Sequence, residues 1–328
     1  MDGETRMPNG LSDIDETWTG GAALPDWFER ALSVPRHEGF VDVNGVPVHY
    51  FRWGKRGKRP VLMTHGFLAH ARCLAFIAPL FAADYDIVAY DLSGMGDSGS
   101  RNYADDEGRA GEMIAVAQGL DMFSTNERPI IVAHSFGARV GVNAVTLAPD
   151  LFGGLIACDM MLLRPDAQMA LWERGHGPPG SGDASKPVSR YPDFATARRR
   201  YVTSPRQDAR ESFLMDYMAF HSLRKIGDEW TWKYSPSVFA SLNSRDSWLA
   251  IAERFIDARC RKAIIYGRES PLFTADSRDY VREQGGEDIA IVEIPDARHH
   301  LMLDQPIAFA AAIAAILAVW TGSSVSGN

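Results

Sequence analysis

The stretch 129–139 constrains the fold of this chain more than any other. Its first part, 130–133, is an apolar, β-branched run typical of a buried strand, and apolar residues recur at helical spacing soon after it. Ser135 lies at the junction. A serine between a buried strand and a helix predicts a nucleophile elbow, in which a strained backbone presents the hydroxyl above the sheet. This turn requires small residues two positions before and after the serine. Ala133 and Gly137 are small, although the usual pattern has glycine at both places.

Apolar runs and helical patterns alternate along most of the chain. The dipeptide Asn44-Gly45 between two such runs predicts a hairpin, because it favours a two-residue turn. Continuous apolar strands that alternate with helices are typical of a mostly parallel sheet covered by helices on both faces, here with eight strands. The hairpin strands are expected at 40–43 and 46–53, and the others at 61–64, 87–90, 130–133, 155–158, 263–266 and 289–294. The helices are expected at about 25–32, 71–82, 107–124, 138–148, 247–256 and 274–284, with a terminal one after Asp304-Gln305-Pro306.

The alternation breaks once, between residues 160 and 244. This segment has no clear strand, is rich in arginine, aromatic and methionine residues, and contains a loop-like stretch at 175–187. We interpret it as a helical cap inserted after the sixth strand. The domain organisation that follows is an N-terminal arm and short helix at 1–35, a core at 36–159 and 245–322, the cap at 160–244 and a C-terminal tail at 323–328.

The composition indicates a globular protein and excludes several classes of function. A chain of 328 residues with 46% hydrophobic side chains can bury one large core and carry one insertion. Its net charge of −8 argues against nucleic-acid binding, because contacts to phosphates need a basic surface. The sequence contains no phosphate-cradling loop, dinucleotide fingerprint or metal-ligand spacing, so neither a cofactor nor a metal is expected.

The cysteines and the ends of the chain predict a cytoplasmic protein that does not bind a membrane. Cys73, Cys158 and Cys260 are odd in number and lie in apolar runs, which favours reduced thiols in a reducing compartment. The N-terminal residues are acidic and lack the apolar segment of a signal peptide. The apolar run 308–320 is too short to span a bilayer and predicts a buried helix. The sequence leaves a homo-oligomer open.

Four landmarks occur in an order that resembles the α/β-hydrolase superfamily, over nearly everything from residue 40 to residue 320. They are His65-Gly66-Phe67 after the third strand, 91–98 (DLSGMGDS) after the fourth, Ser135 after the fifth and 296–300 (DARHH) after the eighth. Each landmark alone is common by chance, whereas the ordered set is specific. The resemblance implies an α/β-hydrolase fold and a member that is similar to the serine esterases, with a cap.

A serine hydroxyl is a poor nucleophile at neutral pH and needs a base that takes its proton. The resemblance implies that His299 is this base, because it lies in the loop after the last strand. The adjacent His300 is the competitor, and the family spacing to Asp304-Gln305-Pro306 favours His299. We interpret His49, His65 and His134, inside or at the edges of core strands, as hydrogen-bonded framework.

The acid that orients the base is not in its usual place. After the seventh strand the family pattern expects Gly-x-x-Asp, but here Gly267 is followed by Ser270 at the acid's position. A neutral serine cannot balance an imidazolium. Asp159, at the end of the sixth strand, is the favoured candidate and resembles a variation found in some small esterases and several haloalkane dehalogenases. Glu269, one residue before the usual position, is the rival acid.

By the same resemblance, the backbone N–H groups of Phe67 and Phe136 form the oxyanion hole. Because the nucleophile is a serine rather than an aspartate, dehalogenase and epoxide hydrolase activities are not expected. The expected reaction is hydrolysis of a carboxylic ester or lactone, on an apolar small molecule, through an acyl-enzyme intermediate. Hydrolysis of the carbon–carbon bond of a vinylogous diketone is the enzymatic alternative. A hydrolase-fold ligand receptor without turnover is the alternative from another class.

The cap carries a local excess of positive charge. Residues 186–225 include nine lysines and arginines but only four acidic residues, in a chain whose net charge is −8. Such an excess can steer an anionic substrate, but we interpret it as a solvated helix face. Methionine and aromatic residues of the same region can line an adaptable apolar pocket or simply pack, so they identify no substrate.

Overall fold

The computed structural model describes residue 18 and residues 24–102, 105–174, 185–243 and 248–322. An eight-stranded sheet with the strand order β1-β2-β4-β3-β5-β6-β10-β11 forms its centre. Strand β2 is antiparallel to both of its neighbours, and all other neighbouring pairs are parallel, as predicted. The strands are β1 Arg36–Val43, β2 Val46–Gly54, β3 Arg59–Thr64, β4 Tyr85–Tyr90, β5 Ile130–His134, β6 Gly154–Cys158, β10 Arg261–Gly267 and β11 Ala290–Ile294.

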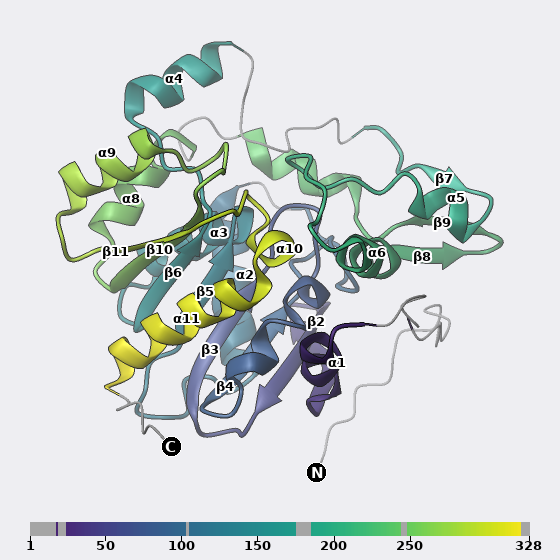
Figure 1. Ribbon diagram of the computed structural model, residues 1–328, viewed down its shortest axis with the longest axis horizontal. Helices are drawn as coiled ribbons and strands as arrows, with labels where there is room; N and C mark the ends of the chain where they lie inside the picture. Colours follow the sequence, from purple (N-terminus) through teal and green to yellow (C-terminus); the bar gives the residue numbers. More distant parts are fainter. Residues whose placement is uncertain (1–17, 19–23, 103–104, 175–184, 244–247, 323–328) are drawn as a thin grey trace.

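Helices cover both faces of this sheet (Figure 1). Successive side chains of a strand point to opposite faces, so Ile131 and Ala133 of β5 pack in one hydrophobic core and Ile130 and Val132 in the other. The first core is closed by α2 Asp106–Gly119, α3 Phe136–Leu147, α8 Ile251–Asp257 and α9 Ala275–Gly285. The second is closed by α1 Asp26–Ser33, η1 Ala71–Leu74, η2 Ala78–Phe81, α10 Leu301–Asp304 and α11 Pro306–Thr321.

One predicted helix is replaced by two shorter elements. The segment 71–82 forms the 3-10 helices η1 and η2 instead of a continuous α-helix. Pro79 lies in η2 and lacks the N–H that an α-helix through this segment requires. The predicted hairpin is confirmed: Asn44 and Gly45 have φ angles of 51° and 81°, and Val43 pairs with Val46.

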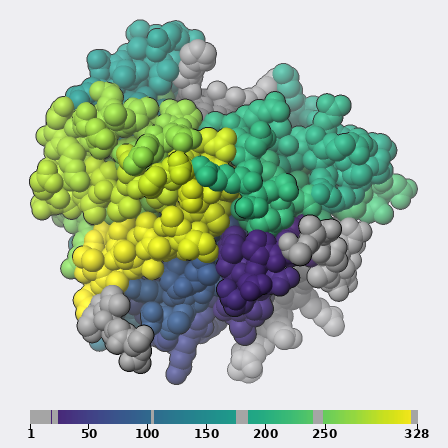
Figure 2. Space-filling view, viewed as in Figure 1, coloured from purple at the N-terminus to yellow at the C-terminus, as the bar shows by residue number. Residues whose placement is uncertain are grey.

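The insertion between β6 and α8 contains both helices and strands. It lies over the carboxyl ends of the parallel strands and beside the C-terminal segment (Figures 1 and 2). Its elements are α4 Pro165–Glu173, β7 Arg190–Tyr191, α5 Phe194–Arg198, α6 Ser212–His221, β8 Leu223–Ile226, β9 Glu229–Trp232 and η3 Pro236–Asn243. The expectation that this cap has no strand was wrong, because β7, β9 and β8 form a three-stranded antiparallel sheet.

The sequence between β8 and β9 favours a hairpin, which explains part of this small sheet. Gly227 has a φ angle of 61° and begins the two-residue connection between β8 and β9. A glycine at the first position of such a connection, followed by a polar residue and then by the alternation of Trp230, Thr231 and Trp232, favours a hairpin. Thr231 is buried, whereas the two tryptophans are half-buried.

Several predicted segments lie outside the described residues. These are most of the predicted arm before residue 24, the first ten residues of the predicted loop 175–187, the start of the predicted helix 247–256 and the tail 323–328. Within the described part, no helix has the length and the apolar character needed to cross a membrane. The three cysteines are free thiols; Cys73 and Cys158 are buried and Cys260 is half-buried.

Candidate active site

Ser135 forms a strained turn between β5 and α3. Its φ and ψ angles are 52° and −117°, a left-handed conformation that non-glycine residues adopt only when their surroundings enforce it. The turn is held by the hydrogen bond that Ser135 N donates to Cys158 O, at 2.8 Å. A Cβ at Gly137 would lie 2.5 Å from the carbonyl oxygen of His65, so glycine is required there. The geometry is that of the predicted nucleophile elbow.

Asp159 and His299 are hydrogen-bonded to each other. Asp159 directly follows β6, beside the elbow, and its Oδ1 lies 2.8 Å from His299 Nδ1. Both side chains are buried. His299 Nε2 is also buried and has no hydrogen-bond partner among the described residues. Since Nδ1 carries the proton donated to the carboxylate, Nε2 offers a lone pair.

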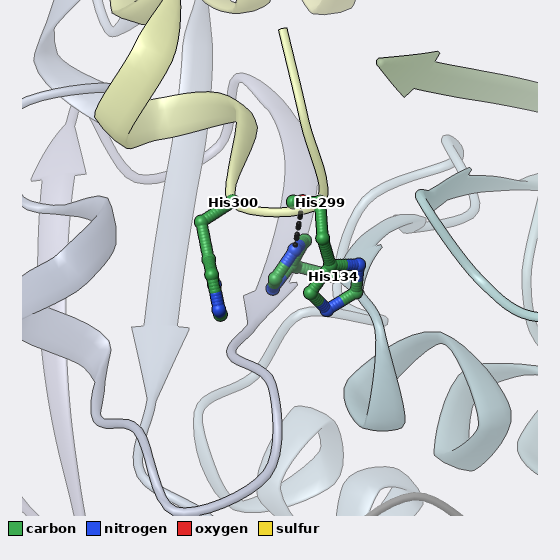
Figure 3. Close-up of side chains that lie close together, drawn as sticks. All are labelled: His134, His299 and His300. Atoms are coloured by element: carbon green, nitrogen blue, oxygen red, sulfur yellow. Dashed lines mark hydrogen bonds between the residues drawn. The ribbon is translucent and has the colours of Figure 1, made fainter. Parts of the chain in front are cut away.

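The segments around Ser135 contact both members of this pair. Ser135 is bound through its backbone to Cys158, the residue before Asp159. The ring of His134, the residue before Ser135, lies 4.8 Å from the ring of His299, and its Nε2 is 2.9 Å from His299 O (Figure 3). Residues that are 140 and 165 positions apart in the chain therefore meet at the ends of β5 and β6.

Ser270 binds the carboxylate of Asp159, a role that the sequence analysis did not predict. Its hydroxyl donates a 2.6 Å hydrogen bond to Asp159 Oδ1, and Gly267 N donates a 2.9 Å bond to Asp159 Oδ2. The serine at the usual place of the acid thus binds the carboxylate that lies on the neighbouring strand. The spacing of Gly267 and Ser270 was the signal in the sequence.

Glu269, the rival acid, is exposed, and none of the side-chain hydrogen bonds described for this structure involves it. Its backbone N–H donates to Ala297 O. The carboxylate beside His299 is therefore that of Asp159.

The loop after β3 passes close to the elbow. A Cβ at Gly66 would lie 3.3 Å from Ser135 Cβ, which places the following residue, Phe67, next to the serine. Phe136 is the first residue of α3, where backbone N–H groups have no partner within the helix. The rings of Phe67 and Phe136 contact each other edge to face, with centroids 5.3 Å apart.

A short cap segment holds the loop that carries His299. Gln207 uses both ends of its amide: Oε1 accepts from His300 N at 2.9 Å and Nε2 donates to His300 O at 3.2 Å. Gln207 is buried. Nearby, Arg298 donates to Asp208 O, and Arg210 donates to Asp296 O. Sequence reasoning missed this contact, because nothing in a cap glutamine points to a histidine 93 residues later.

A cavity of about 60 Å³ opens beside Ser135. Its walls are mainly apolar and come from the loop after β3, the start of α3, the cap and α8; they include Phe67, Phe136, Met160, Met161, Trp248, Ile251 and Leu272. Arg139 is a polar exception, but its guanidinium is paired with the buried carboxylate of Asp106 at 2.5 Å. The accessible space next to the serine therefore suits an apolar group.

The remaining histidines of the core are hydrogen-bonded, as predicted. His65 Nε2 accepts from Leu92 N, and its Nδ1 contacts Gly66 O at 2.7 Å. His49 lies between two carboxylates, with Nδ1 2.8 Å from Asp91 and Nε2 3.0 Å from Glu38. Burial lowers the pKa of His49, but the charge of Asp91 and the hydrogen bonds to both carboxylates outweigh it and raise the pKa to about 9.

The sequence model described as "Alpha/beta hydrolase family" matches residues 61–312. The chain belongs to this family. Among solved structures, the fold is similar to that of E-2-(acetamidomethylene)succinate hydrolase, with a TM-score of 0.69 and 17% identity over 86% of this chain and 99% of the other. It is also similar to the esterase Rv0045c from Mycobacterium tuberculosis, with a TM-score of 0.68 and 17% identity over 89% of this chain and 95% of the other.

Two curated relatives share shorter segments. The chain is 29% identical over 116 residues to "Uncharacterized hydrolase YugF" of Bacillus subtilis, which covers 35% of this chain and 41% of the relative. It is 31% identical over 105 residues to "Karrikin insensitive 2 receptor IA" of Petunia hybrida, which covers 30% of this chain and 37% of the relative. The chain thus spans less than half the length of these relatives.

Proposed function

We propose that this protein is a serine hydrolase that cleaves a carboxylic ester or lactone. Ser135 is the nucleophile, His299 the general base and Asp159 the acid that orients it. The observation that carries the proposal is the 2.8 Å hydrogen bond between His299 Nδ1 and Asp159 Oδ1, beside a strained serine. His299 Nε2 is buried and has no hydrogen-bond partner in the described part of the chain. A carboxylate in this position holds the base in the right tautomer and stabilises the imidazolium that forms.

The reaction follows from these roles. Ser135 Oγ attacks the carbonyl carbon while His299 Nε2 takes its proton. The backbone N–H groups of Phe67 and Phe136 donate to the oxyanion of the tetrahedral intermediate, and the N-terminus of α3 adds a favourable dipole. As the intermediate collapses, His299 returns the proton to the leaving alkoxide. Water then attacks the acyl-enzyme with His299 as base, which releases the acid and restores Ser135. In a lactone the alcohol stays attached to the acid.

The cavity beside Ser135 supports a small apolar acyl group. Its volume is about 60 Å³, and the aromatic and methionine side chains in its wall favour burial of hydrocarbon. The family membership implies a small-molecule substrate, and no metal or cofactor enters the proposed reaction.

A ligand receptor is the second candidate, because relatives from Petunia hybrida are named as receptors. Carbon–carbon hydrolysis uses the same serine and base and differs in the substrate. A panel of p-nitrophenyl esters, lactones and a diketone separates these three functions, because only the receptor leaves all of them intact.

The decisive test uses a fluorophosphonate probe and the variant Ser135→Ala. The wild-type protein should form one covalent adduct, located at Ser135 by mass spectrometry, and Ser135→Ala should lower turnover by about three orders of magnitude or more. The exposed Ser124 provides the matched control, and Ser124→Ala should react and turn over like the wild type. Label on another residue, or full activity of Ser135→Ala, contradicts the proposed function.

A further inference from the structure

Three histidines form a cluster next to the elbow. His134 comes from the end of β5, and His299 and His300 come from the loop before α10 (Figure 3). Their ring centroids are 4.8 Å apart for His134 and His299, 5.6 Å for His134 and His300, and 4.7 Å for His299 and His300. One ring nitrogen of each lies within 4.8 Å of the other two. The proposed catalytic reaction uses only His299.

Each ring has one nitrogen engaged with an oxygen that can only accept. His299 Nδ1 binds the Asp159 carboxylate, His134 Nε2 binds His299 O at 2.9 Å, and His300 Nε2 binds Pro205 O at 3.2 Å. These nitrogens must carry the protons, so His299 Nε2, His134 Nδ1 and His300 Nδ1 carry lone pairs. Histidines that bind metals have this arrangement: a carboxylate or carbonyl fixes the ring through its N–H, and the other nitrogen faces the ion.

In each ring only one nitrogen is engaged by such an acceptor among the described residues, so the other nitrogen remains as a ligand atom. Three neutral imidazole nitrogens suit Zn²⁺, Cu²⁺ or Co²⁺ and do not suit the hard cations Mg²⁺ and Ca²⁺.

The second group of metal-ligating side chains among the described residues lacks this property. His49, Asp91 and Asp97 also have ligand atoms within 4.8 Å of one another. Both nitrogens of His49 are engaged by carboxylates, and with a pKa raised to about 9 the ring is protonated at neutral pH. It has no lone pair for a metal, so the two clusters are chemically distinct.

We propose that His134, His299 and His300 bind one divalent transition metal ion of the zinc class, and that this ion inhibits the enzyme. The ion takes the lone pair of His299 Nε2, which can then no longer accept the proton of Ser135. Zinc–nitrogen bonds are about 2.1 Å long, so the rings must rotate toward one another as the three nitrogens replace water on the ion. The binding part concerns the cluster alone, whereas the inhibition rests on the proposed function.

Binding is tested in the variant Ser135→Ala, which keeps the cluster and removes turnover. Calorimetric titration with Zn²⁺ should give one ion per chain, and Co²⁺ should give the visible absorption of a nitrogen-coordinated ion. Adding His300→Gln should weaken Zn²⁺ binding by at least about tenfold and remove the Co²⁺ spectrum. His134→Gln should do the same, and unfolding curves identify any loss of fold at this more buried position.

The matched control is His37→Gln, because His37 is exposed and lies outside the cluster. It should bind Zn²⁺ like its parent. Zn²⁺ affinity that stays within about twofold in the His300→Gln variant, or that falls equally in the His37→Gln variant, overturns the proposed site.

Inhibition is measured with the wild-type protein as the ratio of ester turnover without and with Zn²⁺, and EDTA should restore the activity. In the His300→Gln variant this ratio should be close to one, because a variant that has lost the site is no longer inhibited by Zn²⁺. If the protein turns over ester but does not bind Zn²⁺, the proposed metal site is wrong and the proposed function stands. If the protein binds Zn²⁺ but turns over no ester, the metal site is supported and the proposal that the ion inhibits an enzyme is wrong.

Discussion

At the scale of single residues, the proposed acid, Asp159, follows a different strand from the one after which the family pattern places it. Asp159 accepts hydrogen bonds from Gly267 N, Ser270 Oγ and His299 Nδ1. Three donors stabilise an ionised carboxylate in a buried place where an unpaired charge is very unfavourable. Ser270, which occupies the position where the family pattern has the acid, is one of these three donors.

Replacement of this acid tests its role. Asp159→Asn should keep the fold but lower turnover by several orders of magnitude, because the amide stabilises the wrong tautomer of His299 and cannot balance its positive charge. Glu269→Gln is the matched control and should change turnover by less than about tenfold, since this side chain is exposed. Ester kinetics with circular dichroism as a fold check measure both. If Glu269→Gln is the inactive variant, the acid is misassigned.

His49 makes stability depend on pH. Its pKa rises from 6.5 to about 9 on folding, so its contribution is fully present below about pH 6.5 and is lost as the pH rises through about 9. The shift corresponds to roughly 3 kcal/mol. Urea unfolding should therefore show that His49→Gln destabilises the protein strongly at pH 6 and much less at pH 10. An equal loss at both pH values contradicts the charged pair with Asp91.

At the scale of elements, the cap and the core meet at the loop that carries His299. The cap residues 205–210 bind this loop through Gln207, Arg210, Asp208 and Pro205. The core also holds the backbone of this loop, through the bond from Glu269 N to Ala297 O and the contact of His134 Nε2 with His299 O, and the cap bonds add to these. We infer that Gln207 is a positioning residue, which acts through His300 on the neighbouring His299.

A variant of Gln207 separates positioning from substrate binding. Gln207→Ala removes both hydrogen bonds to the His300 backbone and should lower kcat about tenfold while KM changes less, because the base is misplaced during the chemical step. Gln118→Ala on the exposed side of α2 is the control and should behave as wild type. A rise in KM at constant kcat would instead place Gln207 in substrate binding.

At the scale of the whole molecule, the basic residues of the cap are distributed over different environments. Arg198 is paired with Asp216, Arg199 donates to Thr196, and Arg200 lines a second cavity of about 160 Å³ between the cap and the core, together with His70 and Lys233. Local pairing of this kind reduces the field that the cap projects toward a substrate.

The triple variant Arg198→Gln, Arg199→Gln and Arg200→Gln should accordingly turn over a neutral ester within about twofold of the wild type. Kinetics with a neutral and an anionic ester, at low and high salt, measure the effect. A large loss that is confined to the anionic ester and disappears in high salt shows that the cap steers substrates by charge.

The order of strands and helices follows from the sequence alone, since it depends on local patterns. Strand β5, the elbow at Ser135, the Asn44-Gly45 hairpin and α11 are each encoded within about fifteen neighbouring residues, and helical and strand periodicities are visible at that range. The β8–β9 hairpin is also encoded by neighbouring residues, through the turn at Gly227, although the surrounding segment has the composition of a helical cap.

Tertiary structure decided which distant side chains meet. Asp159 and Glu269 were both open as the acid, because a sequence gives no distance between a strand end and a loop 140 residues later. The pairing of β6 with β10 brings Asp159 to Gly267 and Ser270 and leaves Glu269 in solvent. The hydrogen bonds of Gln207 to His300 and the cluster of His134, His299 and His300 also join residues that are far apart in the sequence. Such contacts come from packing, which no local pattern records.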